Sequence, residues 1–155
     1  MGMNATKERE VFWNIFDEKL IQNGEPFKII HHRENGEPTY WGNINQKRIF
    51  GPDKTLGVEF RFRDKKIRVG IYLRDDLFLF ERLYTNKEQI ECELGFSVEW
   101  NHIGTQNSNT RRIYTEFDLE LFDANHYADK IDEILPYVVR FKEVFEYRIP
   151  NLFDE

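Results

Sequence analysis

The chain lacks several features that would assign it to a class of protein at once. Its 155 residues include one cysteine, Cys92, so no internal disulfide forms within the chain, as is usual in a reducing cytoplasm. No uninterrupted apolar run of about 18 residues occurs, and the N-terminus lacks the basic-then-apolar order of a secretory signal. The sequence therefore predicts a cytoplasmic protein with no membrane partner.

Signatures of catalysis and of metal binding are also missing from the sequence. It contains no Gly-x-Ser-x-Gly elbow and no glycine-rich phosphate loop, and its histidines (His31, His32, His102 and His126) do not show metal-ligand spacing. Because neighbouring residues of a strand point to opposite faces, we expect His31 and His32 not to share an ion. We predict no catalytic residue, no metal and no cofactor.

One arrangement of letters matches a nuclease motif, PD…(D/E)xK, at Pro52-Asp53 and Asp64-Lys65-Lys66. That chemistry needs two carboxylates on one divalent metal. The strand predicted between them would separate the two aspartates by roughly 20 Å, at about 3.3 Å per residue. We therefore interpret both segments as turns. A metal-dependent nuclease stays a distant alternative, and magnesium-dependent DNA cleavage that is abolished by Asp64→Ala would support it.

The composition is that of one acidic domain rich in aromatic residues. A chain of 155 residues can bury a core of its own, and the 14 Phe, 7 Tyr and 3 Trp are expected mostly inside it. The net charge of -6 argues against a nucleic-acid-binding field over the whole molecule. A local basic face is compatible with this charge.

Hydrophobic periodicity predicts helices over residues 7–22, from Asp76 to Leu94, and over residues 124–147, where Pro136 is expected to kink the helix or start a second one. Alternating patterns predict strands at residues 27–31, 40–44, 46–50, 58–63, 66–73, 98–103 and 111–119. Residues 7–152 are thus predicted to form a single α+β domain, a mostly antiparallel sheet with about three helices on one face. Residues 1–6 are expected to be disordered or derived from cloning.

The segment from Val58 to Leu73, VEFRFR-DK-KIRVGIYL, predicts a hairpin with apolar residues on one face and charged residues on the other. With Asp64-Lys65 as its turn, Arg61 faces Arg68 and Arg63 faces Lys66. Like charges directly opposite one another are mildly destabilising, so this basic strip (Arg61, Arg63, Lys66 and Arg68) is expected to meet acidic groups. The full candidate binding site also includes Arg111 and Arg112 from a later strand and Tyr72.

Two interpretations of the basic strip remain open. It is either a solvated face neutralised by Glu59, Asp118 and Glu120, or a platform for nucleic acid or an acidic protein, with Tyr72, Trp41 or Trp100 available for stacking. A third possibility is a homodimer with an aromatic interface. The aromatic residues proposed for that interface are Phe78, Phe117, Phe122 and Phe153.

Several segments spread over the chain carry a family resemblance. They are Phe12-Trp13, the region of Trp41, VEFRF…KIRVGIYL, KEQIECELGFSVEW, Arg111-Arg112-Ile113 and FKEVFEYRIPNL. Together they resemble an uncharacterised prokaryotic family, a domain of unknown function often joined C-terminally to a predicted restriction-type endonuclease module. The resemblance implies an accessory domain of DNA-related or defence proteins, and it supplies no catalytic residues. Because the domain begins within ten residues of Met1, we expect no nuclease module in this chain.

Overall fold

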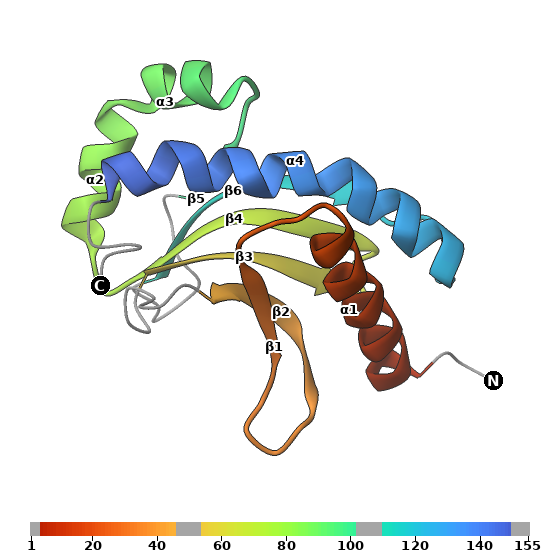
Figure 1. Cartoon of the computed structure of the whole chain (residues 1–155). Helices are drawn as coiled ribbons and strands as arrows, with labels where there is room; N and C mark the ends of the chain where they lie inside the picture. The colour runs from red at the N-terminus through yellow and green to blue at the C-terminus, as the bar shows by residue number, and fades with distance from the viewer. Residues whose placement is uncertain (1–3, 46–53, 102–109, 150–155) are drawn as a thin grey trace.

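A computed structural model of the chain describes residues 4–45, 54–101 and 110–149, which form one α+β domain (Figure 1). Its sheet is antiparallel, with the strands in the spatial order β1-β2-β3-β4-β6-β5. The strands are β1 (Lys28–His32), β2 (Pro38–Asn45), β3 (Lys54–Arg61), β4 (Lys66–Arg74), β5 (Glu99–Asn101) and β6 (Thr110–Asp118). The predicted fold class is confirmed, and the strand predicted over residues 46–50 lies outside the described residues.

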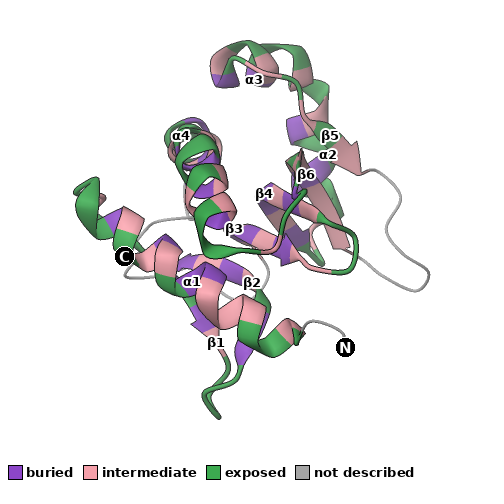
Figure 2. Cartoon of the chain, turned by 90° about the vertical axis from the view of Figure 1, so that its right-hand side faces the viewer, coloured by how far each residue is buried: buried purple, intermediate pink, exposed green. Residues whose placement is uncertain are grey.

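The described residues contain four helices rather than about three. They are α1 (Ala5–Gln22), α2 (Leu77–Thr85), α3 (Lys87–Leu94) and α4 (Ala124–Arg148). Helices α1 and α4 lie over one face of the sheet, and the buried residues gather where they meet it (Figure 2). The other side, called the open face below, has no described helix over it. It carries the side chains that alternate with the buried residues of β3 and β4.

The predicted helix from Asp76 to Leu94 is interrupted at Asn86. Asp76 is the N-cap as expected, since its Oδ1 accepts a hydrogen bond from the Leu79 N–H at 3.1 Å. The break follows from two polar side chains that donate to backbone carbonyls of the preceding turn: Thr85 donates to Glu81 O and Asn86 donates to Arg82 O. Such local hydrogen bonds compete with a continuous helix, so one predicted helix becomes two.

Helix α4 continues through Pro136 for 25 residues and does not begin again as a second helix. Proline lacks an N–H, so the carbonyl of Asp132, four residues earlier, loses its helical partner. Both Pro136 and Asp132 are exposed, and water can therefore solvate this carbonyl. Of the two predicted effects of Pro136, a kink or a second helix, the second helix is wrong, and the exposed proline is accommodated within α4.

An aromatic cluster joins α1, α4 and the sheet. Phe12 stacks on Phe60 of β3 with a centroid distance of 4.5 Å, and the edge of Tyr127 of α4 meets both rings. The Tyr127 hydroxyl donates a hydrogen bond to the Glu8 carboxylate at 2.6 Å. Burial of the ring, together with this carboxylate, raises the pKa of Tyr127 above its ordinary value, so the hydroxyl keeps its proton.

The paired histidines contradict the expectation that they point apart. A β-bulge between Ile30 and His32 shifts the register of β1, so both rings meet with Nδ1 atoms 2.7 Å apart. Their Nε2 atoms contact carboxylates, His31 that of Asp17 at 3.0 Å and His32 that of Glu10 at 3.0 Å. These contacts attach β1 to α1. His102 lies outside the described residues.

A bidentate ion pair ties α3 to the end of α4. Arg148 donates to both carboxylate oxygens of Glu93, at 3.1 and 2.6 Å, and these hydrogen bonds lower the pKa of Glu93 below its usual range. A carboxyl whose pKa is lower when folded contributes stability above its unfolded pKa of about 4.3. That contribution is lost as the pH falls through the folded value.

We therefore expect Glu93→Gln to destabilise the protein at pH 6 more than at pH 3. Urea unfolding of both proteins at these two pH values measures the difference. Arg148→Gln removes the other partner of the ion pair. It should therefore also abolish the pH dependence that this pair contributes to the free energy of unfolding. If wild type and Glu93→Gln differed by the same free energy of unfolding at both pH values, the stabilising role of this ion pair would be contradicted.

Candidate functional site

The hairpin places its faces as predicted but pairs different residues. Arg61 lies opposite Lys66 and Glu59 opposite Arg68, a shift of two residues from the predicted register. The turn contains four residues instead of two. It is closed by a hydrogen bond from the Lys65 N–H to Phe62 O at 3.3 Å, with Lys65 at φ 56. Because side chains alternate with a period of two, this even shift exchanges cross-strand partners without exchanging faces.

The predicted pairs Arg61–Arg68 and Arg63–Lys66 are therefore wrong, and carboxylates balance most of the basic strip. Arg61 bridges Asp64 at 2.6 Å and Glu59 at 3.1 Å. Arg68 pairs with Glu116 at 2.6 Å.

Lys66 is balanced in the same way, by Asp118 of β6. Their mutual hydrogen bond raises the pKa of Lys66 and lowers that of Asp118. Glu59 and Asp118 thus neutralise the strip as predicted. Glu120 instead contacts His126 at 3.1 Å and Lys130 at 3.8 Å.

The other predicted site residues divide between the two faces of the sheet. Arg63 is exposed in the turn. Arg112 lies opposite Tyr72 on the open face, whereas Arg111 lies opposite Leu73, a buried residue on the helix-covered face. Cross-strand partners point to the same side, so Arg111 cannot join the others. The seven predicted residues do not form one surface.

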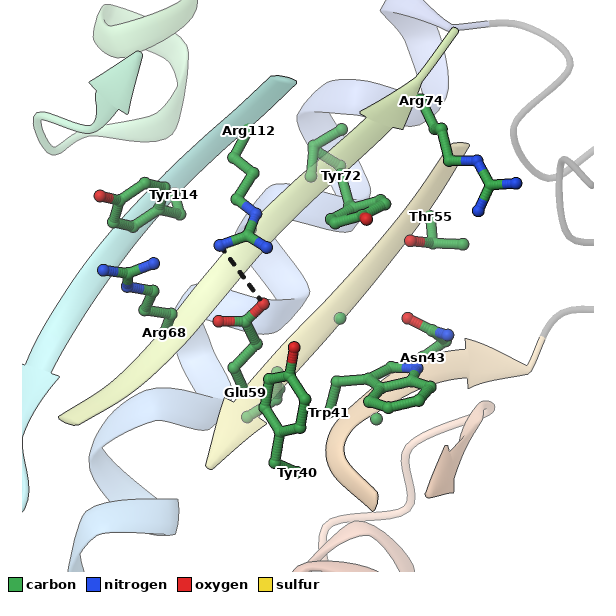
Figure 3. Close-up of a pocket in the computed structure, with 15 residues that line it drawn as sticks. Tyr40, Trp41, Asn43, Thr55, Glu59, Arg68, Tyr72, Arg74, Arg112 and Tyr114 are labelled. Carbon is green, nitrogen blue, oxygen red and sulfur yellow. Dashed lines mark ion pairs between the residues drawn. The ribbon is translucent and has the colours of Figure 1, made fainter. Parts of the chain in front are cut away.

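A hollow of about 340 Å³ occupies the centre of the open face (Figure 3). Its floor is bare backbone where Gly57 of β3 lies directly opposite Gly70 of β4. A Cβ on Gly70 would lie 2.1 Å from Ile113 O, and a Cβ on Gly57 would lie 2.4 Å from Gly42 O. Neighbouring strands approach these two residues too closely for any side chain.

Aromatic rings and arginines surround this floor. The arginines are Arg68, Arg74 and Arg112, and the rings belong to Tyr40, Trp41, Tyr72 and Tyr114. The Arg112 guanidinium lies over the Tyr72 ring at 5.3 Å, and that of Arg68 lies over the Tyr114 ring at 4.5 Å. Such stacking holds the cationic planes against the face of the sheet.

Glu59 is the one acidic side chain among the described residues that line the hollow. It is 16% exposed, and its carboxylate points to Arg112 with an Oε2–Nη1 distance of 3.9 Å (Figure 3). Two further polar groups lie on the far side of Gly57 from Glu59: the amide of Asn43, opposite Gly57, and the hydroxyl of Thr55. The arrangement offers flat apolar faces, cations, and a central hydrogen-bond acceptor.

Sequence reasoning found Trp41, Arg68, Tyr72 and Arg112 but missed the glycine floor, Asn43 and Tyr114. The glycines lie at open-face positions of an otherwise alternating pattern, and this was the available signal for a hollow. Trp100, also expected to stack, donates its indole N–H to Glu91 at 3.1 Å and packs against Phe80. It does not line the hollow.

The described aromatic residues proposed for a dimer interface differ in their exposure. Phe78 is 77% exposed, but Phe117 packs against Tyr137 at 4.9 Å and Phe122 packs against Phe62 at 4.7 Å. Phe153 lies outside the described residues. A homodimer with this aromatic interface stays a prediction.

The described residues contain no group of three or more His, Cys, Asp or Glu placed to hold a metal ion. In the same part of the chain, no helix has both the length and the apolar character needed to cross a membrane. Of the nuclease letters, Asp53 lies outside the described residues and Asp64 is an exposed turn residue that pairs with Arg61.

These features define a single-domain α+β protein with a candidate binding hollow on the uncovered side of its sheet. The chain belongs to a family described as "Domain of unknown function (DUF4268)", whose model matches residues 8–149. The resemblance to an uncharacterised domain family is thereby confirmed. Comparison with curated proteins and with solved structures gives no match.

Proposed function

We propose that this protein is a non-catalytic module that binds single-stranded nucleic acid on the open face of its sheet. The observation that carries the proposal is the hollow itself, in which aromatic rings and arginines surround a floor without side chains. Aromatic rings stack on unpaired bases, and arginines hold the phosphates that connect them.

The contacts of the open face favour a single strand over a duplex or an acidic protein. A duplex or an acidic surface is recognised mainly by excess positive charge, and here Arg61, Lys66 and Arg68 already pair with carboxylates. Guanidinium groups already lie over two aromatic rings of the hollow, Arg33 over Trp41 at 5.2 Å and Arg112 over Tyr72 at 5.3 Å. The remaining faces of the two rings suit a ligand with planar groups that have left their own stack.

The proposal extends to the compartment and the biological role of the module. We place the module in the cytoplasm, since its single cysteine suits a reducing compartment. We also propose a role in restriction or defence, on the strength of the resemblance to domains found beside predicted endonucleases.

Fluorescence anisotropy with a labelled oligothymidine tests the proposed function. We expect binding whose log K falls with log salt at a slope of about -1 to -2, because each phosphate neutralised on a single strand contributes about -0.7. Tyr72→Ala should weaken this binding by about 1–3 kcal/mol, the usual contribution of one stacked base.

The matched aromatic control is Tyr147→Ala, since Tyr147 is 82% exposed on α4, away from the open face. It should bind as wild type does. Failure of wild type to bind single-stranded DNA or RNA at low salt would refute the proposed function. Equal binding by Tyr72→Ala and wild type would show that the hollow is not the site.

A further inference from the structure

We infer, building on the proposed function, that the hollow takes one guanine base of the bound strand and that Glu59 and Arg112 read its Watson–Crick edge. The inference concerns base preference, which general stacking does not produce. It begins with an acidic group at the centre of a hollow that is otherwise lined by arginines, aromatic rings and uncharged groups. A carboxylate at this position would repel the phosphates of the strand. If Glu59 contributes to binding, it therefore does so by contacting the base.

The Glu59 carboxylate has hydrogen-bonding capacity left in this structure. Oε1 accepts from Arg61 at 3.1 Å, and within the described part of the chain Oε2 has only the loose contact with Arg112 at 3.9 Å. A carboxylate offers about four lone-pair positions, so these two contacts leave acceptors available. A distance of 3.9 Å is also too long for a direct hydrogen bond, which leaves Arg112 free to donate elsewhere.

Guanine is the base whose edge matches this pair of groups. Its Watson–Crick edge presents two adjacent donors, N1–H and the N2 amino group, followed by the O6 acceptor. Glu59 can accept both donors, and the neighbouring Arg112 guanidinium can donate to O6. Adenine, cytosine and uracil (or thymine) each present a single donor group on this edge, next to an acceptor. That acceptor would face a carboxylate oxygen of Glu59 and be repelled by it.

The shape of the hollow suits a single flat base. Trp41 and Tyr72 lie on opposite sides of the space next to Glu59, and the floor at Gly57 and Gly70 leaves room for a ring to approach the backbone (Figure 3). At about 340 Å³ the hollow is near the lower end of ligand pockets, roughly 300–1,000 Å³. One nucleotide is therefore read here, and its neighbours are held by stacking and charge.

The experiment compares oligothymidines that carry one central guanine, hypoxanthine, adenine or cytosine. We expect wild type to bind the guanine oligomer about tenfold more tightly than the adenine and cytosine oligomers, as one bidentate contact allows. Hypoxanthine lacks only the N2 amino group, so most of this preference should disappear with it. This comparison uses the unaltered protein and does not depend on whether any variant folds.

Glu59→Gln supplies the second measurement, because an amide replaces one acceptor with a donor that would oppose a guanine donor. We expect its preference for guanine to fall to within about twofold, while binding to plain oligothymidine persists. The control is Glu143→Gln, an exposed α4 residue paired with Arg140, which should keep the wild-type preference.

The outcomes separate this inference from the proposed function. Wild type that binds every oligomer equally overturns the guanine assignment and leaves the binding module intact. A guanine preference that survives both hypoxanthine and Glu59→Gln overturns the role of Glu59. Wild type that binds none of the oligomers removes the proposed function itself.

Discussion

Replacing Phe12 with alanine is expected to lower the free energy of unfolding by about 3–5 kcal/mol. The side chain is fully buried and lies between α1, β3 and α4. It stacks on Phe60 with centroids 4.5 Å apart and meets the edges of Trp13 at 4.9 Å and Tyr127 at 5.7 Å. Truncation removes these three ring contacts and a fourth with Phe16 at 5.9 Å, and it leaves a cavity between the helices and the sheet.

Urea unfolding followed by circular dichroism measures this loss. The matched control is Ile21→Ala in the same helix, where the side chain is 79% exposed and the change should stay within about 0.5 kcal/mol. A Phe12→Ala protein that lost less than about 1 kcal/mol would show that α1 is not packed on the sheet as described.

Gly70→Ala is expected to cost about 3 kcal/mol, the upper part of the range for overpacking. The added Cβ would lie 2.1 Å from Ile113 O and 2.6 Å from the Tyr114 Cα, and neither backbone atom can rotate away. Relief requires β4 and β6 to separate at the centre of the sheet, where Gly70 pairs with Tyr114.

Thermal unfolding monitored by calorimetry tests this expectation, with Gly95→Ala as the control. Gly95 ends α3 in the left-handed region at φ 86 with open space around it, so alanine there should cost only about 1 kcal/mol of conformational strain. If the two variants melted at the same temperature, the close approach of the strands at Gly70 would be refuted.

The sequence was sufficient for the faces of the sheet but not for its pairing. Alternation in the segment from Val58 to Leu73 assigns each residue to a side, and a shift of two residues preserves that assignment. The pairing depended on the turn, and Lys65 adopts a positive φ without the glycine that would have signalled it. The opposed arginines were therefore predicted in error, and the carboxylates that balance them were only partly foreseen.

Helix ends were predictable where a single residue marks them: the Asp76 side chain caps the start of α2, and Gly95 ends α3 in the left-handed conformation. The break at Asn86 was not predictable, because it depends on a side-chain hydrogen bond that competes with a regular helix. The bulge before His32 was not predictable either, because it departs from the regular alternation of a strand. For the candidate site, ring and arginine positions follow from alternation. The hollow itself requires the β2–β3 and β3–β4 pairings, which join residues far apart in sequence.

Along each strand, buried side chains alternate with side chains that face the open side of the sheet, and this alternation bears on how the binding face can change. On β3 and β6, Val58, Phe60 and Ile113 are anchored inside the protein, and their immediate neighbours Glu59 and Arg112 face outward. Exchanging Glu59 or Arg112 would change the groups that the proposed binding site offers to a ligand, while the buried side chains beside them stay in place. Under the proposed function, single substitutions at these two positions would therefore alter specificity with little effect on folding.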